Sequence, residues 1–191
     1  MSISTKRGDD GTTGLLYGGR ARKDSARIET VGAIDEAQAA LGLARAEARL
    51  NSGATALDEE LASLERGLWV LMAEVATEPG NRRKLAAGVS LVTEEMVDGL
   101  GRRVHELESA SDVPAEFVVP GQSRTSAALD LARTVVRRAE RRAVGLKLGE
   151  GSHVVAYLNR LSDLCWLLGR ASESEHMTAR AKAVRAPRAK E

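Results

Sequence analysis

The feature that most constrains the fold is the length of proline-free, helix-favouring sequence. The 191-residue chain contains only four prolines, and the segments between them are rich in Ala, Leu, Arg and Glu, which favour helices. Apolar residues in these segments recur with the period of about 3.6 residues typical of amphipathic helices. Helices are therefore predicted over about 26–50, 56–78, 89–109, 122–147 and 152–173. The connections are mostly short, so we expect an all-α, up-and-down five-helix bundle.

Composition and charge exclude several classes of protein. The 28 Lys and Arg residues balance 27 Asp and Glu residues, for a net charge of +1, which argues against a general nucleic-acid binder. The single cysteine, Cys165, excludes an intramolecular disulfide framework and suits a reducing cytosol. No apolar run approaches the roughly 20 residues that span a bilayer, and the N-terminus lacks the apolar stretch of a signal peptide. We therefore expect a cytoplasmic protein with no membrane or nucleic-acid partner.

Two segments lie outside the predicted bundle. Residues 1–25 are rich in glycine and polar side chains, and we assign them with the bundle to one domain over 1–174. Residues 175–191 carry five basic and two acidic side chains and hardly any large apolar one. Such a tail cannot bury enough apolar surface to offset its ordering entropy, so we expect it to be disordered.

The N-terminal segment has the composition of an anion-binding loop. It contains Thr5, Lys6, Gly8, Gly11, Thr12 and Thr13 within nine residues. Glycines let a backbone approach an anion closely, and Thr hydroxyls and a Lys ammonium add hydrogen-bond donors. The spacing is not that of a P-loop, because Lys6 precedes the glycines and no strand precedes Lys6. A polyphosphate cradle and a flexible glycine-rich leader therefore remain alternatives.

An arginine-rich helix is predicted over residues 122–147. Arg133, Arg137 and Glu140 form one row beside its apolar stripe, whereas Arg138 and Arg142 point toward solvent. Arginines at the edge of a buried face need carboxylate or phosphate partners. The alternative is a surface helix covered by salt bridges, while RNA binding is disfavoured because no aromatic residue is interleaved for base stacking.

Candidate partners occur on other segments. Asp35 lies within the core-facing arc of its helix and could pair with Arg133 or Arg137, although an intrahelical or rim position is an alternative. Asn159 is in a row with Trp166 on the last helix, where it could bind a nucleotide or cap a neighbouring element. Phe117 is in a proline-flanked loop that could dock on the core or present the ring to a flat ligand. The three histidines share no metal-ligand spacing, so no metal site is predicted.

Four segments of the chain resemble one family. They are TKRGDDGTTGL continuing into GGRARKDSARIETVGAIDEAQAALG, then FVVPGQS, ALDLARTVVRRAERR and YLNRLSDLCWLLGR. The amino-acid sequences of these segments and their order along the chain resemble those of the PduO-like, trimeric ATP:cob(I)alamin adenosyltransferases. Together the segments cover about half of the chain. The resemblance implies a ferritin-like five-helix bundle that transfers the 5′-deoxyadenosyl group of ATP to the cobalt of reduced cobalamin and releases triphosphate.

The resemblance also implies roles for individual residues. ATP, accompanied by Mg²⁺, would be held at a subunit interface of a homotrimer. One subunit would supply Thr5, Lys6, Gly8, Gly11, Thr12, Thr13 and Lys23, and its neighbour Arg137, Glu140 and Asn159. Arg133 would pair with Asp35 across the interface, and Phe117 would occupy the lower face of the corrin in place of the axial base. An electron donor and an adenosylcobalamin-dependent mutase would be possible partners.

Two other functions remain open at the level of sequence. One is a helical scaffold whose arginine helix binds acidic partners, which would leave the Thr, Gly and Lys residues of the N-terminal loop without a purpose. The other is a nucleotide-binding regulator without corrinoid chemistry, which would leave Phe117 unexplained.

Overall fold

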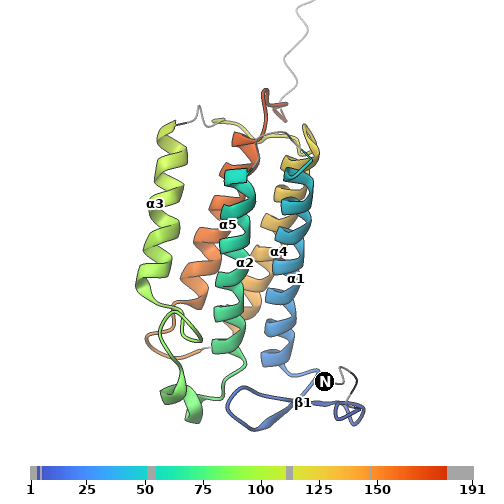
Figure 1. Cartoon of the computed structure of the whole chain (residues 1–191), viewed down its shortest axis with the longest axis vertical. Helices are drawn as coiled ribbons and strands as arrows, with labels where there is room; N and C mark the ends of the chain where they lie inside the picture. The colour runs from blue at the N-terminus through green and yellow to red at the C-terminus, as the bar shows by residue number, and fades with distance from the viewer. Residues whose placement is uncertain (1–3, 5, 51–54, 111–113, 147, 180–191) are drawn as a thin grey trace, which may run out of the picture.

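The computed structural model describes residues 4, 6–50, 55–110, 114–146 and 148–179. These residues include five α-helices, which confirms the predicted bundle (Figure 1). Their bounds are α1 Ala26–Ala48, α2 Thr55–Val75, α3 Glu94–Ala110, α4 Arg124–Leu146 and α5 Val154–Ala171. The helices alternate in direction along the chain, so that the N-terminal segment and the α3–α4 connection lie at opposite ends of the bundle.

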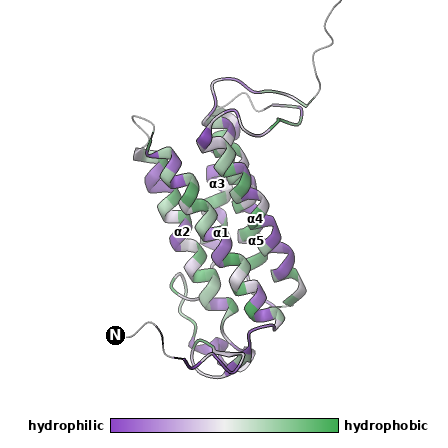
Figure 2. Cartoon of the chain, turned by 90° about the vertical axis from the view of Figure 1, so that its right-hand side faces the viewer, coloured by the Kyte–Doolittle hydropathy of each residue, from purple (hydrophilic) through white to green (hydrophobic). Residues whose placement is uncertain are grey.

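Amphipathic packing holds the bundle together. Hydrophobic and hydrophilic residues alternate along the helices in Figure 2, and the apolar sides meet in one core that includes Ile34, Leu41, Leu68, Leu129 and Leu158. Helix α1 packs against α2 and α4, and α5 packs against α3 and α4. Helix α4 therefore lies between α1 and α5, and it can present different residues to each of them.

Cys165 lies in this core and is completely buried. Burial raises the pKa of the Cys165 thiol to about 12, because an apolar interior disfavours the thiolate. The thiol is therefore a packing group and not a nucleophile.

The segment between α2 and α3 differs from the prediction. A 3₁₀ helix, η1, spans Pro79–Lys84, and α3 begins at Glu94 and not near residue 89. Gly88 adopts a positive φ of 71°, and the Ser90 hydroxyl accepts a hydrogen bond from the Ala86 amide at 2.9 Å. A helix cannot continue through this turn, because the backbone is left-handed at the glycine and the serine side chain competes for an amide.

A short hairpin in the N-terminal segment was not predicted. Strands β1 (Thr12–Gly14) and β2 (Arg20–Arg22) pair antiparallel, with Thr13 opposite Ala21. The connection places Tyr17, Gly18 and Gly19 at positive φ, a conformation that glycine adopts without the strain of a Cβ atom. At three residues each, the strands are too short for a periodicity of apolar residues to reveal them.

The expectation of a disordered tail is wrong for its first residues. Residues 175–179 are ordered, and two backbone hydrogen bonds join them to the α3–α4 connection. The Val119 amide donates to the Met177 carbonyl and the Ala179 amide to the Phe117 carbonyl, both at 2.7 Å. Backbone pairing needs no large apolar side chains, so composition could not show it. The rest of the predicted tail, 180–191, lies outside the described residues.

The described helices include none with the length and apolar character needed to cross a membrane.

Candidate functional site

The N-terminal loop is ordered by a polar network of its own. The Asp10 carboxylate accepts hydrogen bonds from the amide and hydroxyl of Thr12 at 2.9 and 2.8 Å. Arg20 donates from Nε to the Thr12 hydroxyl at 2.9 Å and from a terminal nitrogen to the Arg7 carbonyl at 2.7 Å. The hydrogen bonds from Thr12 lower the pKa of the Asp10 carboxyl, with a smaller contribution from the Arg20 charge. Hydrogen bonds among its own residues therefore hold the loop in shape.

The other predicted loop residues surround Lys23. Its amide donates to the Gly11 carbonyl at 2.9 Å. A Cβ atom at Gly8 would lie 3.0 Å from the Lys23 ammonium nitrogen, so the glycine allows this close approach. Lys6 adopts a positive φ of 56° beside this turn. The structure thus brings Lys6, Gly8, Gly11, Thr12, Thr13 and Lys23 into one loop, while Thr5 lies outside the described residues.

The loop is attached to the end of α2 and to the α2–α3 connection. The Leu16 amide donates to the Ala76 carbonyl at 3.0 Å, and the hydroxyls of Tyr17 and Ser90 are 3.3 Å apart. These contacts fix the hairpin to the bundle end that carries the start of α1 (Figure 1).

A groove between α4 and α5 gathers the predicted residues of the arginine helix. Arg133 and Arg137 line a cavity of about 270 Å³ together with Asp163 and Trp166. One turn further along α4, Glu140 accepts a hydrogen bond from the Asn159 amide at 3.2 Å. Partial burial raises the pKa of the Asp163 carboxyl, and the charges of Arg160 and Arg137 act in the opposite direction. The groove therefore offers cationic and hydrogen-bonding groups on one side of the helix.

On the opposite side of α4, glutamates of α1 pair with two of the arginines. Arg138 and Arg142 are exposed, as predicted, and they also pair with Glu36 and Glu29 of α1. Lys23 borders the same face, at a cavity of about 280 Å³. The N-terminal loop and the α4–α5 groove thus lie on different sides of α4 within one chain.

Asp35 is not at the position that the sequence predicted. It is exposed on α1, whereas its neighbours Ala33, Ile34 and Ala37 take the buried positions. Among the described residues Asp35 forms no ion pair with Arg133, which instead has the Asp130 carboxylate 3.8 Å from its Nε. The expectation of a carboxylate on the core-facing arc is therefore wrong for the single chain, because the three apolar neighbours fill that arc.

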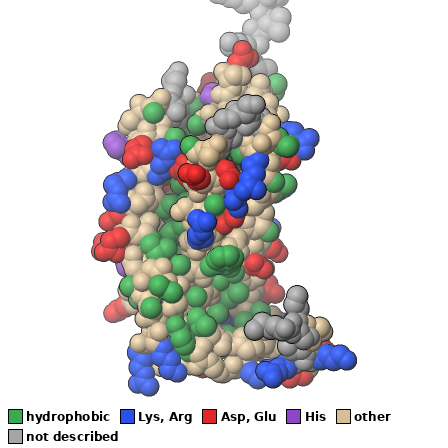
Figure 3. Space-filling model, in the orientation of Figure 1, with side chains coloured by type: hydrophobic (Ala, Val, Ile, Leu, Met, Phe, Trp, Pro, Cys, Tyr) green, Lys and Arg blue, Asp and Glu red, His purple; other side chains and the backbone are tan. Residues whose placement is uncertain are grey.

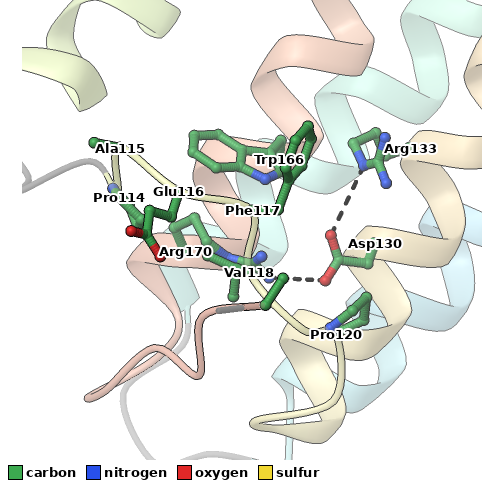
Figure 4. A pocket seen from close by; sticks show the side chains of 11 residues that line it. Pro114, Ala115, Glu116, Phe117, Val118, Pro120, Asp130, Arg133, Trp166 and Arg170 are labelled. Atoms are coloured by element: carbon green, nitrogen blue, oxygen red, sulfur yellow. Dashed lines mark hydrogen bonds and ion pairs between the residues drawn. The ribbon is translucent and has the colours of Figure 1, made fainter. Parts of the chain in front are cut away.

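Phe117 borders the largest cavity described, of about 550 Å³ (Figure 4). Its ring is 88% exposed, so the loop presents the ring and does not dock it on the core. Trp166 and Arg133 line the same cavity, and prolines at 114 and 120 flank the loop. Arg133 borders both this cavity and the α4–α5 groove, so the two cavities share a wall.

Sequence reasoning missed a buried ion network behind this cavity. Arg170 donates to Asp130 at 2.8 Å and to Glu173 at 3.1 Å. The side chains of these three residues are 3%, 7% and 0% exposed. An available signal was the charge of Asp130 within the apolar run ALDLA, one helical turn before Arg133.

Another cavity, of about 460 Å³, lies between α2 and α3. Apolar side chains such as Leu64, Met96 and Leu100 line it, and Glu60 and Arg103 pair across the two helices at 2.7 Å. Figure 3 shows apolar side chains gathered in the lower half of the corresponding face. None of the residues predicted for function borders this cavity.

Among the described residues, no group of three His, Cys, Asp or Glu side chains has the arrangement of a metal site.

Comparison with known proteins gives consistent matches. Residues 3–172 match the model of the family described as cobalamin adenosyltransferase. A corrinoid adenosyltransferase of Bacillus subtilis is 38% identical over 174 residues, which are 89% of this chain and 86% of that protein. A cobalamin adenosyltransferase of Cupriavidus metallidurans is 36% identical over 170 residues, which are 88% of this chain and 86% of that protein.

Solved structures agree with this result. A variant of the PduO-type ATP:corrinoid adenosyltransferase from Lactobacillus reuteri, complexed with cobalamin and ATP, superposes with a TM-score of 0.83 at 26% identity. The match covers 94% of this chain and 100% of that one. A second variant of the same protein, complexed with ATP, gives a TM-score of 0.80 and covers 93% and 100% of the two chains.

Proposed function

The chain belongs to the cobalamin adenosyltransferase family, and from this premise we propose that it transfers the 5′-deoxyadenosyl group of ATP to the cobalt of a reduced corrinoid. The observation that carries this function is the pair of adjoining cavities on α4 and α5. One presents the exposed ring of Phe117, the other presents Arg137, and Arg133 borders both. A corrinoid beside Phe117 and the triphosphate of ATP beside Arg137 can therefore both contact Arg133.

Phe117 acts on the corrinoid. Cobalt(II) that carries an axial base is hard to reduce, because the base donates into the orbital that must accept the electron. An apolar ring in place of the base cannot donate, so one electron from an external donor converts cobalt(II) to the nucleophile cobalt(I). The 88% exposure of Phe117 supports this role, since a ring docked on the core could not reach a corrin.

The reaction itself is a displacement at the ribose. The cobalt(I) electron pair forms the Co–C5′ bond while the C5′–O bond breaks, and triphosphate leaves with that electron pair. Arg137 stabilises the charge on the leaving triphosphate, and Glu140 and Asn159 position the nucleoside end of ATP. Mg²⁺ enters with ATP, whose triphosphate oxygens are ligands it prefers.

The ATP site is formed between subunits of a homotrimer. Support comes from α4, because the N-terminal loop with Lys23 lies on its α1 side and Arg137 lies on its α5 side. One ATP molecule can contact both groups when they come from two chains. In such an assembly the exposed Asp35 pairs with Arg133 of the neighbour, whose side chain is 31% exposed. The product would pass to an adenosylcobalamin-dependent mutase in the cytoplasm.

The direct test of function mixes the protein with ATP, Mg²⁺ and chemically reduced cob(I)alamin without oxygen. We expect the absorbance change of Co–C bond formation and one triphosphate released per adenosylcobalamin. Reactions without protein or without ATP are the controls. Failure to form adenosylcobalamin under these conditions would overturn the proposal.

The shared site is tested by co-expressing two variants that are each inactive on their own. Lys6→Ala damages the loop half and Arg137→Ala the groove half, so neither homotrimer retains an intact site. Trimers that form at random from equal amounts of the two variants should together recover about a quarter of the wild-type activity. Each mixed trimer has one undamaged interface out of three, whereas the unmixed trimers have none. If each site lay within one chain, co-expression would restore nothing.

A further inference from the structure

Asp130 is a buried carboxylate at the wall between the two cavities of the site. It borders the Phe117 cavity (Figure 4), and its side chain is only 7% exposed. Oδ2 accepts a hydrogen bond from Arg170 at 2.8 Å, and Oδ1 is 3.8 Å from Nε of Arg133. The function proposed above assigns no role to this carboxylate.

Within one chain, the ion pair with Asp130 is the tightest restraint on Arg133 among the described residues. Its Nε is buried and has no hydrogen-bond partner among the described residues, while its side chain as a whole is 31% exposed. The direction of the guanidinium therefore depends on the charge of Asp130, because an attraction at this distance is strong where water is largely excluded. Both cavities are affected by that direction, since Arg133 borders each of them.

Asp130 is itself held firmly. Arg170, which is 3% exposed, contacts Asp130 and Glu173 together, and its guanidinium carbon is 5.8 Å from the ring centroid of Trp166. A planar guanidinium between two carboxylates and an aromatic ring has little freedom to turn. The carboxylate that faces Arg133 is thus fixed to the same helix that carries Trp166.

We infer that Asp130, anchored by Arg170, is a positioning residue that holds Arg133 in place between the corrinoid and the triphosphate. This inference rests on the proposed adenosyl transfer, because it concerns the geometry of that site.

The chain offers a matched pair of variants as the test. Asp130→Asn and Glu173→Gln each remove one buried carboxylate from Arg170 and leave it the other, and Glu173→Gln also changes the contact between Glu173 and His176 at 2.8 Å. Only Asp130 also faces Arg133. A merely structural role predicts similar effects for the two variants, whereas a positioning role predicts that they separate.

The readouts are steady-state transfer from cob(I)alamin and the visible spectrum of cob(II)alamin bound with MgATP. The spectrum reports loss of the axial base independently of turnover. We expect Asp130→Asn to lower kcat/KM by about tenfold to a hundredfold, the size expected of a misplaced catalytic group, and to decrease the base-free fraction. Glu173→Gln should remain close to wild type in both readouts, and thermal denaturation should show whether its fold is weakened to the same extent as that of Asp130→Asn. In an Arg133→Ala background, Asp130→Asn should add no further loss.

Equal losses in the two variants, or wild-type kinetics in Asp130→Asn, would overturn the inference. If Asp130→Asn does not fold, Arg170→Lys replaces it, because lysine keeps the buried charge but loses the planar group that lies over the Trp166 ring and directs one terminal nitrogen to Asp130. Wild-type turnover in a folded Arg170→Lys variant would then overturn the inference. A wild-type protein that forms no adenosylcobalamin would refute the proposed function instead, so the two failures are distinguishable.

Discussion

The two loops that serve the site, one at each end of the bundle, are stabilised in opposite ways. Residues 6–25 carry an internal network in which Asp10 binds Thr12 and Arg20 binds Thr12. The loop around Phe117 is joined to residues 177–179 by two backbone hydrogen bonds, and its aromatic ring remains 88% exposed. The first loop is held by hydrogen bonds among its own residues, whereas the second leaves its aromatic side chain exposed.

This difference fits the two ligands. A polyanion is bound by donors that must already be in place, because donors that reorganise on binding would cost affinity. A corrin is a large apolar surface, and an exposed ring gains its stabilisation only when that surface covers it. We therefore expect ATP binding to depend on order within its loop, and corrinoid binding to depend on one side chain.

The largest loss of activity is expected from a change at Arg137, which lies on α4 between the two loops. Arg137→Ala removes the charge that stabilises the leaving triphosphate, so turnover should fall by more than about a hundredfold from either oxidation state of cobalt. Steady-state rates from cob(I)alamin and from cob(II)alamin with a reductant measure this. Arg124→Ala is the control, because Arg124 is on the same helix but pairs with Glu47 at its outer end. An Arg137→Ala variant that retains most of its activity would contradict a common site for both loops.

Phe117→Ala should separate the two oxidation states. Without the ring the axial base stays on cobalt(II), so the reaction that starts from cob(II)alamin should fall by about a hundredfold or more. The reaction that starts from cob(I)alamin should fall much less, because reduction is already complete. Val119→Ala, in the same loop and 40% exposed, is the control. Equal losses from both starting states would show that Phe117 contributes only to binding.

A smaller effect is expected in the other loop. Asp10→Asn weakens both hydrogen bonds to Thr12 because a neutral amide oxygen accepts less strongly than a carboxylate, and the Kd for ATP should rise by about threefold to tenfold. The Kd for the corrinoid should not change. Isothermal titration measures both constants, and Asp24→Asn is the control because Asp24 is in the same loop and pairs only with Arg22. Unchanged or tighter ATP binding would show that Asp10 does not order the loop.

The five helices were predictable because their evidence is repeated over many residues. A run of about 20 residues with apolar positions every three or four leaves few alternatives. The residues of the α4–α5 groove followed from the same geometry, since Arg133, Arg137 and Glu140 share one row of a helix. Their placement needed only the handedness and period of the helix.

The parts that were not predicted depend on contacts between distant residues. The Arg170–Asp130 pair joins residues 40 positions apart, and neither residue type indicates its partner. The order of residues 175–179 comes from backbone pairing with the Phe117 loop, which leaves no trace in side-chain composition. The exposure of Asp35 was misjudged because one helix has a wide apolar arc, and the sequence does not show where its edge meets solvent.

The smallest expected effect is the pH dependence of the N-terminal loop. Hydrogen bonds from Thr12 lower the pKa of the Asp10 carboxyl below its ordinary value of 3.8. A lowered pKa in the folded state means that the carboxylate stabilises the loop at neutral pH, and that this contribution is lost only as the pH falls through the lowered pKa. The order of the loop should therefore be constant from pH 7 to pH 5. Nuclear magnetic resonance of the Asp10 carboxyl carbon as a function of pH measures the midpoint. A midpoint for Asp10 at or above 3.8 would mean that the network does not persist in solution, and the two loops would then be equally dependent on their ligands.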